Sequence, residues 1–249
     1  MIMKLDDSKN KMTLQELIDT KNFINQLSVD CAIFGFHDNS LKILLLKYHE
    51  LNLWAIPGGF IFEDEHLDDA AHRILYERTH LEDVYLQQFY AFGGIDRTEK
   101  NNPHRQLLAN KGIEIDKDHW INKRFVTVGY YALIDYTLSH TFPDAFNETC
   151  AWFDVHDLPE MAFDHKEIIE KGLEHLRKTL DYDIVGSNLL PEKFTMKDLQ
   201  NLYEAILGEK FRRNNFQRKM LSLNILDRHE KLFSGSANKA PYLYSFKKK

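Results

Sequence analysis

The stretch WAIPGGFIFEDEHLDDAAHRILYERTHL, residues 54–81, joins a glycine turn, an acidic loop and a helix in one short segment. From about Asp64 to His80 the apolar residues recur at helical spacing, which predicts an amphipathic helix with one buried face. That face consists of Leu67, Ala70, Ala71, Ile74 and Leu81. This segment decides the fold class, because it predicts a helix between runs of sequence that predict strands.

Aromatic and β-branched residues dominate those flanking runs, as is typical of strands. VDCAIFGF and LKILLLKYH, separated by the turn-forming HDNS, predict a β-hairpin. VYLQQFYAFG, RFVTVGYYALIDY and CAWFDV predict further strands, and a helix is expected from Asp164 to about Thr179. Since strands outnumber helices and a helix falls between strands, the sequence predicts a mixed α/β domain that ends near Leu180.

The connection from Arg97 to Arg124 is polar, largely without periodicity, and long for a link between two strands. Loops of this length are usually functional or disordered. We favour a flexible surface excursion over a lid that closes on a ligand.

Length and composition limit the class of protein. The chain has 249 residues, 43% of them hydrophobic, so it can bury a sizeable core. Its polar N-terminal extension, residues 1–28, lacks the apolar core of a signal peptide, and no apolar run approaches the roughly 20 residues of a membrane span. With only two cysteines, a disulfide framework is excluded. We expect a cytoplasmic protein without a membrane partner.

Charge is distributed unevenly along the chain. Residues 209–249 contain 11 Lys or Arg and 3 Asp or Glu, whereas residues 1–208 contain 21 and 35. This opposition predicts two units with different partners, the basic unit being a candidate for nucleic acid.

After a linker at residues 181–191, the last unit, residues 192–249, reads as two helices and a hairpin. In TMKDLQNLYEAILG, Thr195 is the expected N-cap, Asp198 its capping-box partner and Gly208 the C-terminal stop. RRNNFQRKMLSL predicts a second helix, and EKLFSGSANKAPYLYSF predicts two short strands around a basic tip. This order predicts a winged helix-turn-helix.

The exposed face of the second helix carries side chains suited to the major groove of DNA. Arg can pair with guanine, and Asn or Gln with adenine. The candidates for base contacts are Arg213, Asn214, Asn215, Gln217 and Arg218; those for phosphates are Lys210, Arg212, Lys219 and Lys239. A solvated face in a protein-interaction domain is the alternative.

The opening segment resembles the Nudix box, Gly-x5-Glu-x7-Arg-Glu-U-x-Glu-Glu-x-Gly-U, where U is aliphatic. The matching residues are Gly59, Glu65, Arg73, Leu75, Glu77 and Leu81. The resemblance implies a Nudix α/β/α sandwich with a mixed sheet over residues 29–180, followed here by the small winged helix-turn-helix domain.

This sequence departs from the box where Nudix hydrolases bind Mg²⁺. Their three ligand positions are Ile74, Glu77 and Arg78 here, and His80 replaces the usual glycine. One carboxylate is too few for a hard cation, so we expect no catalytic residue, no bound metal and no cofactor. The alternative is an active, Mg²⁺-dependent pyrophosphatase for ADP-ribose-type substrates, with metal recruited by Glu63 and Glu65. Otherwise these are loop acids, and Glu65 caps the helix.

The two halves together, from Val29 to Phe246, resemble the Nudix-related transcriptional regulators of the NrtR and AraR type. FGGIDR, RFVTVGYYAL, LLPEKFTMKDLQNLYEAILG and NFQRK carry this resemblance. It implies a homodimeric regulator, here a repressor, that binds palindromic operator DNA and senses an ADP-ribose-like nucleotide or a pentose sugar such as arabinose. The scarcity of acids in the box slightly favours the sugar. Asn214 and Gln217 stand where the family commonly has Arg.

Candidates for effector binding flank the box. They are Glu65, Glu77, Asp96, Arg97 and Arg124, and paired Asp and Arg side chains suit polyhydroxyl ligands. Asp96 and Arg97 have an equally good alternative as a simple turn. Trp54 is expected in the core, although it could stack on a sugar.

Overall fold

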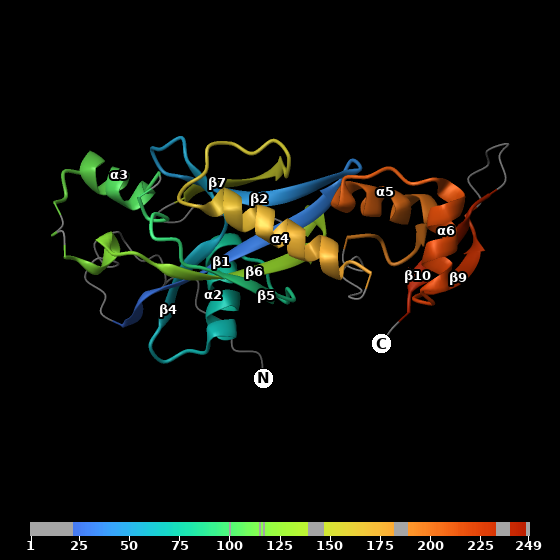
Figure 1. Ribbon diagram of the computed structural model, residues 1–249, viewed down its shortest axis with the longest axis horizontal. Helices are drawn as coiled ribbons and strands as arrows, with labels where there is room; N and C mark the ends of the chain where they lie inside the picture. The colour runs from blue at the N-terminus through green and yellow to red at the C-terminus, as the bar shows by residue number, and fades with distance from the viewer. Residues whose placement is uncertain are drawn as a thin grey trace.

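The computed structural model describes residues 22–99, 101–114, 116, 118–138, 147–181, 189–232 and 240–247. A larger N-terminal half adjoins a smaller C-terminal half along the long axis of the molecule (Figure 1). The larger half contains β1 (Phe23–His37), β2 (Ser40–Tyr48), β3 (Trp54–Ala55), β4 (Gly58–Phe62), α2 (Leu67–Thr79), β5 (Gln87–Phe92), α3 (Pro103–Asn110), η1 (Trp120–Asn122), β6 (Val126–Ile134), η2 (Tyr136–Leu138), β7 (Asn147–Asp154) and α4 (His165–Thr179).

One mixed sheet organises this half. Its strand order is β3-β2-β1-β6-β5, with β4 paired to β1 and β7 paired to β2. β1 and β6 run parallel, and the other pairs are antiparallel. In the predicted β1–β2 hairpin His37 pairs with Ser40, so Asp38 and Asn39 form the turn, with φ of 48° and 58°. Asp and Asn tolerate this left-handed conformation, as a two-residue hairpin turn requires. β1 begins at Phe23, six residues before the start expected at Val29.

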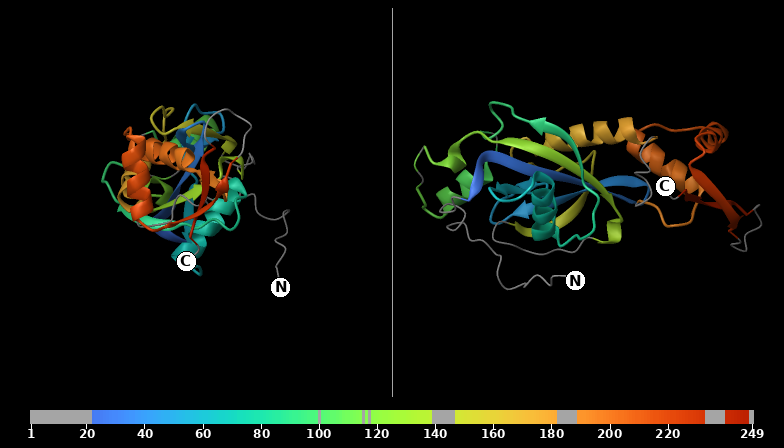
Figure 2. Two further views of the ribbon diagram at one scale, coloured as in Figure 1. Left: turned by 90° about the vertical axis from the view of Figure 1, so that its right-hand side faces the viewer. Right: turned by 90° about the horizontal axis from the view of Figure 1, so that it is seen from below.

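Helices cover both faces of the sheet, which confirms the α/β/α sandwich. Because successive strand residues point to opposite faces, Ala32 and Phe34 pack on the side of α4, whereas Cys31 and Ile33 pack on the side of α2. Figure 2 shows the two helices on opposite sides of the sheet. The buried residues of α2 are Ala70, Ala71, Ile74, Leu75 and Thr79.

α2 ends in a residue with a left-handed backbone conformation, although that residue, His80, is not the glycine usual at this position of the Nudix box. His80 has φ 54° and ψ 23°, and its N–H donates to the Tyr76 carbonyl oxygen at 2.7 Å. The loop therefore keeps the backbone conformation that glycine would adopt, at some cost in strain.

The connection after β5 is not the unstructured excursion expected from its polarity. Within residues 101–114 it forms α3, whose N-cap Asn102 accepts from the Arg105 N–H at 3.2 Å. Leu107 and Leu108 are buried in a third apolar cluster with Phe23 of β1. A few apolar side chains thus anchor a polar segment that shows no helical periodicity as a whole.

The smaller half contains β8 (Phe194–Thr195), α5 (Met196–Leu207), α6 (Arg213–Ser222), β9 (Leu226–Lys231) and β10 (Tyr242–Phe246). Thr195 and Asp198 form the predicted capping box, and Gly208 ends α5 with φ 73°. β9 and β10 form the predicted hairpin, and β8 adds a third strand in the order β8-β10-β9. The winged helix-turn-helix is confirmed.

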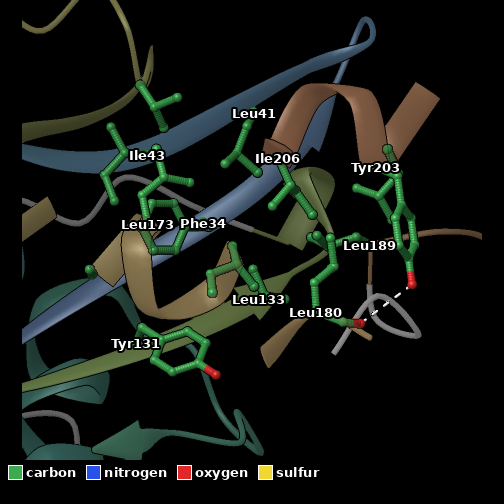
Figure 3. Close-up of a cluster of buried hydrophobic side chains, with 14 of the residues drawn as sticks. Phe34, Leu41, Ile43, Tyr131, Leu133, Leu173, Leu180, Leu189, Tyr203 and Ile206 are labelled. Atoms are coloured by element: carbon green, nitrogen blue, oxygen red, sulfur yellow. Dashed lines mark hydrogen bonds between the residues drawn. The ribbon is translucent and has the colours of Figure 1, made fainter. Parts of the chain in front are cut away.

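The two halves share one apolar core. The cluster on the α4 side of the sheet continues through Leu180 and Leu189 to Tyr203 and Ile206 of α5 (Figure 3). The Tyr203 hydroxyl donates to the Leu180 carbonyl oxygen at 3.4 Å. Within the described part of the chain, helices long and apolar enough to span a bilayer are absent.

Candidate functional site

Arg73 of α2 holds two of the predicted site residues. Its Nε and Nη2 donate to the Glu65 carboxylate at 2.9 and 2.5 Å, and its Nη1 donates to Glu77 Oε2 at 3.0 Å. Burial raises the pKa of Glu65, but hydrogen bonds from Arg73 and from the Phe62 N–H lower it below its ordinary value overall. The expectation that Glu65 caps α2 is wrong, because His66 occupies that position without a side-chain cap. Glu65 instead connects the loop before α2 to the helix, through its bonds with the Phe62 N–H and Arg73.

Ile74, at the first expected metal position, is part of the core. Its side chain is 1% exposed and packs with α2 neighbours against the sheet. A Cβ at Gly59 would lie 3.0 Å from Ile74 Cγ1, so the glycine permits close approach of β4 to the helix. The aliphatic side chain and the glycine together fix the distance between the two elements.

Arg78 brings a permanent positive charge to the last metal position. Its Nε donates to the Gly58 carbonyl oxygen at 3.3 Å, so the guanidinium lies beside the start of β4. Burial, then the positive charges of Arg78 and His165, lower the pKa of His104 to about 4. His104 is therefore neutral near pH 7.

These residues do not fit Mg²⁺, which takes several oxygen ligands in octahedral geometry. Ile74 offers none, Glu77 is paired with Arg73, and Arg78 repels a cation. Across the described ranges, groups of three or more His, Cys, Asp or Glu side chains placed to hold a metal ion are not found. The box retains its architecture without the ligand set of a magnesium site.

Arg97, predicted to contact an effector, lies inside the protein. Its side chain is 5% exposed, and its Nη2 lies 2.9 Å from Asp164 Oδ1 and 3.4 Å from Asp30 Oδ2. His165 Nε2 is 3.7 Å from Asp30 Oδ1, while the Ile56 N–H donates to His165 Nδ1 at 3.2 Å. This buried cluster joins β1, the turn after β5 and the first residues of α4.

Asp96 and Arg124 are exposed. The Glu99 N–H donates to the Asp96 carbonyl oxygen at 3.1 Å, so Asp96 takes part in the turn that was its alternative interpretation. Trp54 packs edge-on against Phe153 with ring centroids 4.6 Å apart, in agreement with a core role. The structure thus joins Glu65 and Glu77 through Arg73, buries Arg97 and leaves Asp96 and Arg124 at the surface.

An aromatic group beside the box was missed at the sequence level. Phe60 of β4 lies with its ring centroid 5.1 Å from that of Trp120 and 5.3 Å from that of Phe125. Trp120 Nε1 is buried without a hydrogen-bond partner. His104 is 6.5 Å from Phe60 between ring centroids. The sequence signal was weak, because these rings come from segments about 60 residues apart.

A second candidate surface is the outer face of α6. Phe216 and Met220 are buried on the inner face, and the exposed residues include Arg212, Arg213, Asn214, Asn215 and Arg218. Asn215 Oδ1 accepts from the Arg218 guanidinium at 3.2 Å. The arrangement offers guanidinium and amide groups along one helical face, as major-groove recognition requires.

The remaining predicted residues of this surface have mixed positions. Gln217 is half-buried, Lys210 pairs with Glu204 at 2.7 Å, and Lys219 pairs with Asp181 at 2.7 Å. Lys239 lies outside the described residues.

Sequence reasoning also overlooked cations on the hairpin. The Arg228 guanidinium carbon lies 4.7 Å and the Lys231 Nζ 5.3 Å from the centroid of the exposed Tyr242 ring. The alternation of charged residues in LDRHEK was the signal that could have identified them.

Comparison with known proteins covers both halves. Residues 24–172 match the family described as the NUDIX domain, and residues 186–246 match the NrtR DNA-binding winged helix domain. The chain is 30% identical over 228 residues to the "ADPR responsive transcriptional repressor NtrR" of Acinetobacter baylyi, covering 88% of this chain and 81% of that protein.

Two solved structures agree with this. NrtR of Shewanella oneidensis has 29% identity and a TM-score of 0.64, with 89% of this chain and 94% of that chain covered. The structure of Shewanella oneidensis NrtR with a 27mer DNA has the same identity and coverage, and a TM-score of 0.65.

Proposed function

The chain belongs to the Nudix-related transcriptional regulators of the NrtR type, and we propose that it is a repressor whose binding to double-stranded operator DNA is controlled by ADP-ribose. The Nudix-type half senses the nucleotide, and the winged helix reads the operator. The observation that carries this proposal is the exposed face of α6, with its three arginines and two asparagines, on a chain related throughout to a repressor.

The nucleotide is favoured over the pentose sugar that the scarcity of box carboxylates suggested. The relative from Acinetobacter baylyi is named for its response to ADPR. Arg78 also places a positive charge beside the box, which suits a diphosphate better than a neutral sugar.

Control of DNA binding requires a path from the box to α6, and we assign it to α4. At its first turn, Asp164 and His165 belong to the buried cluster with Arg97 and Asp30. Beyond its last turn, Lys219 of α6 binds Asp181. Near that end, Arg177 Nε donates to the Ile206 carbonyl oxygen at 2.7 Å. Because the two halves share one core, a shift of α4 moves α6 with it. The effector weakens binding by its preference for the conformation that fits the operator poorly.

We further propose that the protein works as a homodimer without hydrolysing its effector. Two-fold symmetric dimers place two recognition helices on the two halves of a palindromic site. A dimer predicts a mass in solution of twice 29.4 kDa by light scattering. Release of AMP and ribose 5-phosphate from ADP-ribose in the presence of Mg²⁺ would instead favour the alternative of an active pyrophosphatase.

The proposal is tested with the full chain and DNA. Repeated selection from random 30-base-pair duplexes supplies an operator, and fluorescence anisotropy then measures affinity with and without ADP-ribose. We expect sequence-selective, salt-sensitive binding that ADP-ribose weakens at least fivefold and arabinose leaves unchanged, since coupling energies are typically 1–3 kcal/mol. Failure to enrich any sequence would support a protein-interaction module instead. Selective DNA binding that ignores ADP-ribose would disprove the choice of effector.

A further inference from the structure

The first residue of α4 is hydrogen-bonded to the segment that leads into the Nudix box. We propose that this residue, His165, is the positioning residue that couples the box to α4. A displacement of residues 54–58 on effector binding is passed through it to the helix and from the helix to α6. This inference rests on the proposed function, and it adds to it the contact at which control of DNA binding begins.

The His165 ring bridges the box segment and the buried cluster. His165 is 4% exposed, and its Nδ1 accepts from the Ile56 N–H at 3.2 Å. A ring nitrogen that accepts carries no proton, so the proton of the neutral ring is on Nε2, which lies 3.7 Å from Asp30 Oδ1. Burial lowers the pKa of His165, so the ring is neutral near pH 7. The Ile56 contact therefore depends on one ring nitrogen held in one tautomer.

Backbone hydrogen bonds reinforce this contact. The Trp54 N–H donates to the Glu160 carbonyl oxygen at 2.9 Å, and the Ala162 N–H donates to the Trp54 carbonyl oxygen at 2.8 Å. Trp54 also forms a parallel bridge with Met161. Residues 160–165, which we call the α4 entry segment, thus follow β3 and stay bonded to the chain as far as Ile56. The start of α4 and the segment before the box have to move together.

The α4 entry segment contains a strained residue. Phe163 has φ 49°, a left-handed conformation that is unfavourable for a bulky side chain. Its N–H donates to the Asn101 carbonyl oxygen at 3.4 Å, and its ring centroid lies 5.6 Å from that of His165. Strained residues persist only where surrounding contacts hold them, and they are enriched at switch regions. The bend at Phe163 lies between the bonds to Trp54 and the first turn of α4, where a movement of the helix would be taken up.

On its other side, Ile56 is continuous with closely packed parts of the box. The Cys31 N–H donates to the Pro57 carbonyl oxygen at 2.7 Å. Gly59 approaches α2 so closely that a Cβ there would lie 3.0 Å from Ile74 Cγ1. Because packed elements transmit displacements, a ligand that shifts β4 or α2 also shifts residues 56–58. The hydrogen bond to His165 then carries this shift to α4.

α4 is long enough to enlarge the movement. It has 15 residues, which corresponds to about 22 Å, and it runs from the larger half toward the smaller one (Figure 1). A small rotation at His165 therefore displaces the far end of the helix by more. Near that end Arg177 binds the Ile206 carbonyl oxygen of α5. The winged helix is consequently repositioned without any contact to the effector.

Two substitutions of His165 in the full-length protein test the inference. His165→Leu removes the acceptor of the Ile56 N–H, whereas in His165→Asn the Oδ1 atom can replace Nδ1 as the acceptor. Anisotropy titration against the selected operator measures how far ADP-ribose weakens binding. We expect about fivefold or more in wild type, less than about twofold in His165→Leu and about threefold or more in His165→Asn.

Two further measurements separate loss of coupling from general damage. Operator affinity without ADP-ribose, and calorimetric ADP-ribose affinity without DNA, should each stay within about threefold of wild type in both variants. Loss of coupling changes only the effect of one ligand on the other. A variant that is merely misfolded would lose both affinities.

Phe163→Gly provides an independent variant and decides the matter if His165→Leu does not fold. Glycine adopts a φ of 49° without strain and leaves the bend flexible, so the displacement should be absorbed there and the effect of ADP-ribose should fall below about twofold. Glu50→Gly is the matched control, since Glu50 is exposed and has φ 58° in the turn between β2 and β3. It should respond to ADP-ribose as wild type does.

The outcomes that overturn the inference differ from those that overturn the proposed function. A wild-type protein whose operator affinity ignores ADP-ribose would reject both. If wild type responds and His165→Leu responds equally, the inference alone is rejected. The same holds if His165→Asn loses as much as His165→Leu, because the Ile56 bond would then not be the coupling contact. An equal loss in Phe163→Gly and Glu50→Gly would also contradict it.

Discussion

The Nudix-type half and the winged helix use arginine in opposite ways. In the first, Arg73 is held by two glutamates of its own segment and Arg97 is enclosed by two aspartates. In the second, Arg212, Arg213 and Arg218 are exposed, and the first turn of α6 contains no acid. Cations near a helix N-terminus oppose the helix dipole. The arginines of the Nudix-type half are thus paired inside the protein, whereas the arginines of α6, which we propose bind DNA, are exposed at a helix end that disfavours positive charge.

The strongest test of this contrast is Arg97→Ala. Removing the guanidinium leaves Asp30 and Asp164 buried without their cation, which should lower the free energy of unfolding by about 3–5 kcal/mol. Urea denaturation followed by circular dichroism measures the loss. Arg97→Lys keeps the charge and should lose less. A change below about 1 kcal/mol would show that the cluster does not stabilise this half.

Arg213→Ala should have the opposite profile. Its side chain is exposed, so the free energy of unfolding should change by less than about 0.5 kcal/mol. The free energy of operator binding should weaken by about 1–3 kcal/mol. Anisotropy titration against the selected operator measures the second effect. Lys111→Ala, at an exposed position after α3, is the control and should bind DNA normally. Equal operator affinity of the two variants would remove Arg213 from the interface.

Acidification should destabilise the Nudix-type half through His104 and His165. The pKa of His104 is about 4, and burial also lowers that of His165, against an ordinary value of 6.5. The unfolded chain therefore binds more protons between these values. Stability is fully present above pH 6.5 and falls as the pH drops toward 4, by at most about 1.4 kcal/mol per pH unit and per group. Denaturation of His104→Gln between pH 4.5 and 7 should show a shallower dependence; an unchanged slope would contradict the assignment.

The smallest effect is expected where the two halves meet. Asp181→Asn removes the negative partner of Lys219. Because this ion pair lies at the protein surface, the free energy of unfolding should change by less than about 1 kcal/mol. If Lys219 also contacts a DNA phosphate, the loss of its ion pair with Asp181 should tighten operator binding a few-fold. The slope of the logarithm of the binding constant against the logarithm of the salt concentration should then steepen by about one. Unchanged DNA affinity would assign Lys219 to the junction alone.

Local patterns in the sequence determined many of the elements and the two-part architecture. The capping box of Thr195 and Asp198, the stop at Gly208 and the helix at residues 165–179 involve residues within a few positions of one another, so local chemistry fixes them. The same holds for the basic face of α6, because helical spacing alone separates Phe216 and Met220 from the arginines.

Only the tertiary structure decided which of these residues meet. Arg97 was predicted near an effector, but Asp30 and Asp164, 67 residues away on either side, surround it in the core. α3 was missed because its helix depends on burying Leu107 and Leu108 beside Phe23, far along the chain. Contacts between distant segments follow from packing, and no periodicity within a single segment encodes them. The sequence by itself specified a Nudix box with altered ligand positions and a basic recognition helix. The fold determined that Arg73 binds Glu65 and Glu77, and that the apolar core on the α4 side of the sheet continues into α5 and α6.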